Sequence, residues 1–146
     1  MFVVDTNVFL YAANEDYPEY KCCRKLLQGW REGLTPWYVT WGILYEFLRV
    51  TTHPRVFQTP WTLKASWQFI ESLLASPGIR ILQETDRHAQ VAKEIVSEYK
   101  TLRGSILHDI HVVILMREHG IEQIYTRDSD FYRFKFLKVK DPLSEA

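Results

Sequence analysis

The feature that most constrains the fold of this chain is an alternation of short apolar runs with amphipathic helical stripes. The runs typical of strands are residues 1–4, 34–40, 79–83, 122–126 and 136–139. Between them, apolar residues recur at helical spacing, as in Tyr20, Cys23, Leu27 and Trp30. Because strands that alternate with helices favour parallel pairing, we expect a parallel sheet with helices on both faces.

Prolines, glycines and capping residues mark the expected helix boundaries. The first half should hold a helical turn at 8–13, a helix from Pro18 to just before Gly33, and a helix capped by Thr40 that runs to about Val50. The second half should hold a helix with the stripe Leu63, Trp67, Ile70 and Leu74, one with His88, Ala92, Ile95, Tyr99 and Leu102 that stops at Gly104, and one capped by Ser105 that ends at Gly120. No repeat or linker interrupts the pattern, so we expect one domain over 1–146.

Five acids lie at breaks in this apolar pattern: Asp5, Glu46, Asp109, Asp128 and Asp130. Asp5 ends the first strand, and Asp128 follows the strand at 122–126. In parallel sheets the ligand site lies beyond the carboxyl ends of the strands, so these two should share an edge. Acids in such places cost stability unless something positive binds them, and a divalent cation is the simplest partner.

Carboxylates in such a group suit hard cations. Mg²⁺ and Mn²⁺ take oxygen ligands, and three or four carboxylates are enough for one or two ions. A bound metal lowers the pKa of its water and neutralises phosphate charge, and two metals can stabilise both the attacking and the leaving oxygen. Since no nucleophilic dyad is visible in the sequence, we favour metal-assisted phosphodiester hydrolysis.

Each acid also has a structural interpretation. Asp5 could be a strand-end turn residue with Asn7 as its partner. Glu46 could form an ion pair with Arg49 on a solvated helix face. Asp109 could favour the positive end of its helix, and Asp128 and Asp130 could be ordinary turn residues. The set of five is more specific than any single member.

Composition narrows the class of protein. The 18 basic and 18 acidic residues balance, which argues against a strongly basic nucleic-acid coat but not against a local patch. No apolar run is as long as a membrane span, and the first residues read as a core strand rather than a signal peptide. Cys22 and Cys23 are adjacent and should be reduced thiols, with no spacing that suggests zinc. We expect a cytoplasmic protein with no membrane contact.

The acids fall in four motifs, in this order: Val4-Asp5-Thr6-Asn7, Tyr45-Glu46-Phe47, His108-Asp109-Ile110-His111, and Thr126-Arg127-Asp128-Ser129-Asp130-Phe131. Together they resemble the ordered motifs of PIN domains, and within these the VapC-type toxin ribonucleases. The segment 49–57 is similar to one VapC subgroup, as are 131–134 and 141–143. The likeness runs from the first strand almost to the C-terminus. One departure is the bulky Ile110, where the family often has a small residue.

The resemblance implies a three-layer α/β/α sandwich with a central parallel sheet. It implies a Mg²⁺- or Mn²⁺-dependent endoribonuclease that acts on RNA, usually as a homodimer, and is inhibited by a VapB-type antitoxin. Carried over by position, Asp5, Glu46, Asp109 and Asp128 match the family's acidic site, and Asp130 matches a fifth, more variable acid. Thr6, Asn7 and Thr126 match polar residues around the metal, where they could orient carboxylates or water.

Roles follow from these positions. Asp5 and Asp109 should bind the main metal directly. Glu46 should act through water or help to activate the attacking water, and Asp128 should hold a second metal or order the waters of the first. The family's hydrolytic mechanism predicts a 5′-phosphate and a 3′-hydroxyl. The number of metals, the RNA target and the antitoxin are left open.

An acidic pocket needs cations nearby to bind RNA. The candidates are Arg49, His53, Arg55, Arg127, Arg133 and Lys135, each of which could equally be ordinary solvated charge. His108 and His111 flank Asp109, and we favour packing or hydrogen bonding for both. Of the tryptophans, Trp67 lies on a helical stripe, and Trp61, in the proline-bounded loop, is expected to be the exposed one.

Two other functions compete with the ribonuclease. A phosphatase with an aspartyl nucleophile commonly has a second Asp two residues after the first, but Asn7 occupies that position. A non-catalytic, receiver-like or scaffold domain would use its acids to bind Mg²⁺ for structure. A receiver clusters its acids near the first strand, however, whereas Glu46 and Asp128 lie far along the chain.

Overall fold

The computed structural model describes residues 1–145 and contains a five-stranded, wholly parallel sheet. Its strands are β1 (Phe2–Val4), β2 (Trp37–Val39), β3 (Ile79–Ile81), β4 (Gln123–Tyr125) and β5 (Lys138–Lys140). Each overlaps an apolar run expected to be a strand, so the parallel α/β prediction is confirmed. Pairing is limited to three residues per strand.

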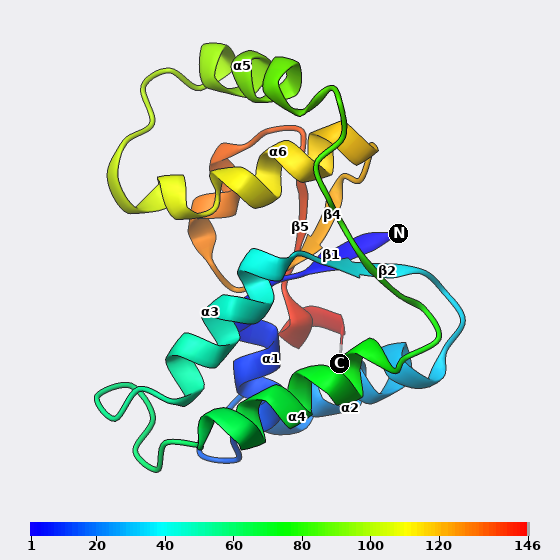
Figure 1. Cartoon of the computed structure of the whole chain (residues 1–146), viewed down its shortest axis with the longest axis vertical. Helices are drawn as coiled ribbons and strands as arrows, with labels where there is room; N and C mark the ends of the chain where they lie inside the picture. Colours follow the sequence, from blue (N-terminus) through cyan, green and yellow to red (C-terminus); the bar gives the residue numbers. More distant parts are fainter. Residues whose placement is uncertain (146) are drawn as a thin grey trace.

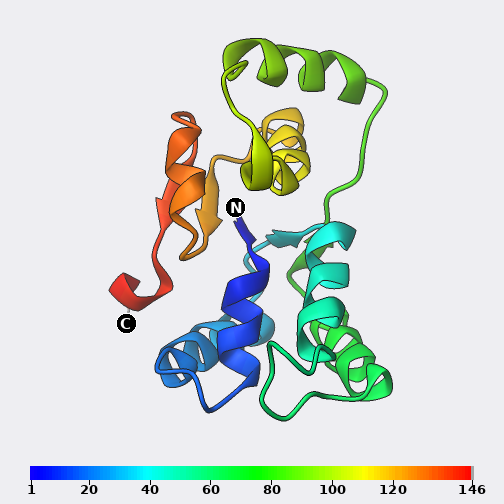
Figure 2. The ribbon, with the colours of Figure 1, turned by 90° about the vertical axis from the view of Figure 1, so that its left-hand side faces the viewer.

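Helices cover both faces of the sheet in a three-layer α/β/α arrangement. They are α1 (Thr6–Ala13), α2 (Tyr20–Glu32), α3 (Trp41–Thr51), α4 (Leu63–Leu74), α5 (His88–Glu98) and α6 (Ile110–His119), with 3₁₀ turns η1 (Gly104–His108), η2 (Ser129–Arg133) and η3 (Pro142–Glu145). Figure 1 shows α5 and α6 on one side of the strands and α1, α2 and α4 on the other. The perpendicular view separates the same two groups (Figure 2). Among the described residues, no helix has the length and apolar character needed to cross a bilayer.

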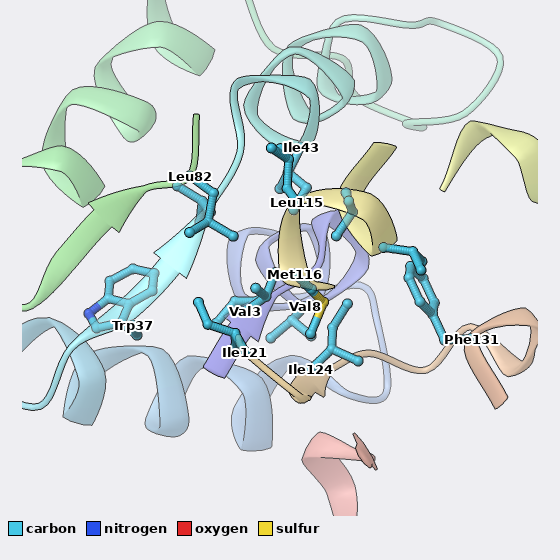
Figure 3. Packing of buried hydrophobic residues seen from close by; sticks show 14 of the residues in the cluster. Val3, Val8, Trp37, Ile43, Leu82, Leu115, Met116, Ile121, Ile124 and Phe131 are labelled. Carbon is cyan, nitrogen blue, oxygen red and sulfur yellow. The ribbon is translucent and has the colours of Figure 1, made fainter. Parts of the chain in front are cut away.

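The core lies between the sheet and its two helical layers. Val3 and Ile124 of the central strands are fully buried, as is Trp37 of β2. Strands covered on both faces read as continuous apolar runs, which is why these segments are recognisable in the sequence. Figure 3 shows Leu115 and Met116 of α6 packed among the same residues.

Strand order creates a switch point between β1 and β4. The order β3-β2-β1-β4-β5 means that the chain builds outward from β1 to β3 and then returns to the other side of β1. At such a point the connections leave opposite faces of the sheet, and a crevice opens beyond the strand ends. Val4 pairs with Tyr125, so Asp5 and Thr126, the next residues along, lie side by side.

Two helix boundaries differ from the sequence prediction. Ser105 does not cap the helix that carries Asp109, because Gly104 has a φ of 80° and the chain enters the 3₁₀ turn η1 instead. Asp109 itself precedes α6. The helix α5 ends at Glu98, before Leu102. The predicted end of α6 is confirmed, because Gly120 adopts the left-handed conformation, with φ 70°, that glycine tolerates best.

The stripe predicted for α4 is partly wrong. Its buried residues are Ser66, Ile70 and Leu73, whereas Trp67 is 37% exposed. Ser66 can be buried because its hydroxyl shares a 2.7 Å hydrogen bond with the hydroxyl of Thr51. That compensation depends on a neighbouring helix and leaves no trace in the periodicity of α4.

The expectation that Trp61 is the exposed tryptophan is also wrong. Its ring lies edge-on to Phe47, Phe57 and Phe69, with centroids 5.9–6.3 Å away. This aromatic cluster anchors the proline-bounded loop between α3 and α4. Trp67 is therefore more exposed than Trp61.

Candidate active site

The crevice at the switch point is built around the carboxylate of Asp5. Oδ1 accepts a 2.7 Å hydrogen bond from the backbone N–H of Thr6, at the start of α1. Oδ2 accepts one from the hydroxyl of Thr126, at 2.8 Å, and one from the side-chain amide of Asn7, at 3.2 Å. These bonds fix the orientation of a buried acid by donors from the start of α1 and from the residue after β4.

Thr126 links the two strand ends. Its hydroxyl donates to Asp5 and accepts from the amide of Asn7 and the backbone N–H of Asp128, both at 3.0 Å. Asp128 in turn accepts from the N–H of Asp130 at 2.9 Å, which holds the turn before η2. Both the turn role considered for Asp128 and its place beside Asp5 are therefore seen.

Asp109 and Glu46 enter the crevice from helices. Asp109 is half-buried at the residue before α6, and its side chain caps no backbone N–H there. Glu46 lies on α3, where Arg49 donates to both its oxygens at 2.6 and 2.9 Å. The ion pair considered from the sequence is thus present, and it coexists with a position in the crevice.

These acids face one cleft of about 790 Å³. The residues lining it are Asp5, Thr6, Asn7, Leu10, Thr40, Gly42, Ile43, Glu46, Arg49, Ser105, His108, Asp109, His111, Val112, Asp128 and Asp130. All five acids selected from the sequence are among them. Thr40 and Ser105 were expected only as helix caps, so their exposure to the cleft was not foreseen.

Crowding of negative charge shows in the pKa values. Burial raises the pKa of Asp5 to about 6, against the hydrogen bonds from Thr126 and Thr6. Burial likewise raises the pKa of Asp109 to about 7, and the charges of the four other acids add to the effect. Glu46 differs, because the hydrogen bonds from Arg49 lower its pKa. The cleft therefore holds more negative charge than its own side chains compensate, which favours a bound cation.

The cations expected to bind RNA are placed differently from one another. Arg49 lines the cleft. Arg127 is engaged away from it, in ion pairs with Glu19 at 2.8 Å and Asp141 at 3.3 Å. His53 accepts a hydrogen bond from the backbone of Arg55 in the loop after α3, and neither is among the described residues that line the cleft.

The comparison with a family model identifies the family. Residues 2–137 match the model described as the PIN domain. The chain belongs to the PIN domain family. This match covers every strand except β5 and all four sequence motifs, and it is the reason to set aside the phosphatase and receiver interpretations.

Curated relatives of this PIN domain match over nearly their whole length. Ribonuclease VapC48 of Mycobacterium tuberculosis is 29% identical over 140 residues, covering 96% of each chain. Ribonuclease VapC43 of the same species is 30% identical over 143 residues, covering 98% of this chain and 96% of the relative.

Solved structures share the fold at lower identity. VapC20 of Mycobacterium tuberculosis, described as a Sarcin-Ricin loop cleaving toxin, has a TM-score of 0.68 at 19% identity and covers 97% of this chain and 100% of its own. VapBC2 from Rickettsia felis, bound to a DNA fragment from its promoter, has a TM-score of 0.65 at 14% identity and covers 95% and 96%.

Proposed function

We propose that this PIN domain is a metal-dependent endoribonuclease toxin of the VapC type. The observation that carries the proposal is the convergence of Asp5, Glu46, Asp109 and Asp128 from four separate segments on one cleft. The names of the curated relatives, which are VapC ribonucleases, support the choice of RNA as the substrate.

The donor set fits Mg²⁺ or Mn²⁺. Every acid at the cleft offers carboxylate oxygen, the ligand that hard divalent cations prefer. A cation held directly by Asp5 and Asp109 would offset the burial and the repulsion that together raise their pKa values to about 6 and about 7. Asp128 and Asp130 would complete the site through ordered water. A bound ion would supply neutralisation of phosphate charge and a more acidic water.

The protein's own residues position the reactants. Thr6, Asn7 and Thr126 hold the carboxylate of Asp5 in one orientation, so its free lone pairs point in a fixed direction. Glu46 would orient the attacking water by accepting a hydrogen bond from it. Because Arg49 lowers the pKa of Glu46, this carboxylate is a poor proton acceptor while the ion pair lasts.

Arg49 supplies positive charge where RNA would enter. Its side chain is 61% exposed, so it can leave Glu46 and contact a phosphate with little loss of stability. We propose that His53 and Arg55 extend this contact along the loop after α3, while Arg127 supports the fold through Glu19 and Asp141. The products would carry a 5′-phosphate and a 3′-hydroxyl.

We also propose that a VapB-type antitoxin inhibits the protein and that it forms a homodimer. An open acidic cleft is a hazard to cellular RNA, so a partner that covers it is needed. Trp41 and Tyr45 of α3 stack with ring centroids 5.8 Å apart, and Tyr45 is 58% exposed, which gives an aromatic surface suited to a protein contact. Sedimentation analysis of the wild type and of Tyr45→Ala tests the dimer.

The test of the enzyme is cleavage of structured RNA, including transfer RNA, by purified protein free of antitoxin. Cleavage should require Mg²⁺ or Mn²⁺, stop with a chelator, and fall by at least about 100-fold in Asp5→Asn. Asp16→Asn changes an exposed acid away from the cleft and should cleave like the wild type. Cleavage that survives in Asp5→Asn, or is equally lost in Asp16→Asn, would contradict the proposed site.

A further inference from the structure

A second cluster of potential ligands lies where α5 meets α6, and it includes His111, which also lines the acidic cleft. Glu84 follows β3, His88 begins α5, and His111 lies in the first turn of α6. Each offers one ligand atom, and these atoms lie within 4.8 Å of one another. Two imidazoles and a carboxylate brought together from three segments form a donor set unlike that of the acidic cleft.

His88 is oriented by a carboxylate behind it. Its Nδ1 lies 2.8 Å from Oε2 of Glu118, whose side chain is fully shielded from solvent. Burial acts to raise the pKa of Glu118, but hydrogen bonds from His88 and from the side chain and backbone of Thr85 lower it to about 2. A carboxylate can only accept hydrogen bonds, so the 2.8 Å contact with Glu118 places the hydrogen of His88 on Nδ1. When the ring carries only this hydrogen, its lone pair is on Nε2.

This carboxylate–imidazole pair is the arrangement that fixes metal-binding histidines elsewhere. Thr85 donates to Glu118 at 2.9 Å from its backbone and at 2.7 Å from its hydroxyl, so the carboxylate is itself held on its other oxygen. Glu84 and His111 nevertheless offer ligand atoms within 4.8 Å of that of His88, which a histidine that served only to satisfy Glu118 would not need.

His111 and Glu84 are already in contact. Nε2 of His111 lies 2.7 Å from Oε1 of Glu84, and the rings of His88 and His111 are 5.8 Å apart. Tetrahedral ligands about 2.0–2.1 Å from zinc are about 3.4 Å from each other, so Glu84 and His111 must separate slightly, and pairs as far apart as 4.8 Å must come closer. Both side chains are about half exposed, which leaves them free to rotate. His111 would shift its hydrogen to Nδ1 to present Nε2.

We propose that Glu84, His88 and His111 form a zinc site with one position open to water, and that the ion ties α5 to α6. Two imidazole ligands favour Zn²⁺ over Mg²⁺, which prefers oxygen. His111 also lines the acidic cleft, so the ion would lie at the rim of that cleft, distinct from the site of Asp5. This site does not depend on whether the protein cleaves RNA.

The test is zinc binding by chelator-treated protein in millimolar Mg²⁺, measured by competition with a chromophoric chelator. One Zn²⁺ should bind per chain. Glu84→Gln, which alters an exposed side chain and should leave the fold intact, and His88→Gln should each weaken binding by at least about tenfold, and Glu118→Gln by about tenfold. His119→Gln removes a nearby histidine, bonded to the carbonyl of Gln83, and should bind like the wild type.

Two further variants test whether zinc binds at the acidic cleft or at a thiol instead of at this cluster. Asp128→Asn and Cys22→Ser should leave the affinity unchanged, since neither residue belongs to the cluster. At the same zinc concentration, zinc should also raise the thermal unfolding midpoint of the wild type by more than that of Glu84→Gln. The proposal is overturned if no zinc binds, if Glu84→Gln and His88→Gln bind as tightly as the wild type, or if binding is lost in Asp128→Asn or Cys22→Ser.

Discussion

Asp5 and Glu118 are both carboxylates shielded from solvent, and each accepts three hydrogen bonds, yet their pKa values move in opposite directions. That of Asp5 rises to about 6, and that of Glu118 falls to about 2. Burial acts to raise both pKa values, but the hydrogen bonds from His88 and Thr85 outweigh it at Glu118, whereas those from Thr126 and Thr6 do not at Asp5. The charges of Asp128 and Glu46 add to the rise at Asp5.

The comparison separates two uses of a buried acid. At Glu118 the protein compensates the charge from within, and the acid joins α5 to α6. At Asp5 compensation is incomplete, and the energetic cost is retained in the metal-free folded protein. A cluster that destabilises its own protein is a feature expected of a functional site rather than of a structural one.

The largest expected effect comes from removing one charge at the cleft. Asp109→Asn should lower RNA cleavage by at least about 100-fold, because a metal ligand is lost. It should also stabilise the metal-free protein by about 1 kcal/mol at pH 7.5, because mutual repulsion among the acids falls. Cleavage assays and urea unfolding measure the two effects. If Asp109→Asn were active and less stable than the wild type, the contrast between an uncompensated functional acid and a compensated structural one would be wrong.

Removing the carboxylate of Glu118 should have the opposite effect, with a large loss of stability and little change in cleavage. Glu118→Ala leaves the N–H of Thr85 and the imidazole of His88 without their shared acceptor, and should cost about 3 kcal/mol of unfolding free energy. Cleavage per folded molecule should stay near that of the wild type. Urea unfolding in the presence of a chelator isolates this effect from metal binding.

A surface acid provides the matched control. Glu122→Ala removes a partner of Lys138 on exposed side chains and should not change stability measurably. If both variants lost the same stability, the hydrogen bonds around Glu118 would not be the cause.

The pH dependence should follow the raised pKa values. Between the ordinary value of 3.8 and the folded values of about 6 and about 7, the folded protein binds more protons at Asp5 and Asp109 than the unfolded chain does. Stability of the metal-free protein should therefore fall as pH rises from 5 to 8. Discounted for solvent around the half-exposed Asp109, the loss should be about 2 kcal/mol.

Glu118 does not interfere with this measurement. Its pKa is lowered from 4.5 to about 2, so its contribution is complete above the unfolded value and constant from pH 5 to 8. Saturating Mg²⁺ should flatten the profile by binding the ionised acids, raising the unfolding midpoint by a few degrees more at pH 8 than at pH 5. A metal-free profile that rises with pH would contradict the assignment of Asp5 and Asp109.

The smallest effect should come from Arg49→Gln. Loss of its exposed ion pair with Glu46 should change stability by less than about 1 kcal/mol. Release of Glu46 leaves the cleft more negative, so the Mg²⁺ concentration for half-maximal cleavage should fall by about threefold, while KM for RNA rises. Lys64 is an exposed cation outside the cleft, so Lys64→Gln is the control. If it changed the Mg²⁺ requirement and KM as much as Arg49→Gln does, the effect would be one of general charge only.

Helices and strands were predictable where a short stretch of sequence decides which residues are buried. The strands are recognisable because both faces of the sheet are covered, and the acids because they interrupt apolar runs. Ser105 was misassigned because the positive φ of Gly104 redirects the chain, and a single sequence does not show which glycines use that freedom. Ser66 was missed because its partner, Thr51, lies on another helix.

The candidate site was predictable only in part for a similar reason. Fold logic brings Asp5 and Asp128 to one edge, but Glu46 reaches it through helix packing, and family resemblance was needed to include it. The cluster of Glu84, His88 and His111 gave no sequence signal, since its members come from three elements with no motif spacing.

The hydrogen bond between Thr126 and Asp5 joins residues 121 positions apart. During synthesis, Asp5 leaves the ribosome early, whereas Thr126 and Asp128 follow only after α1 to α6 have been made. A nascent chain that has folded its first helices still lacks half of its acidic cleft. The order of the strands thus delays the assembly of the acidic cleft until β4 and the residues that follow it have left the ribosome.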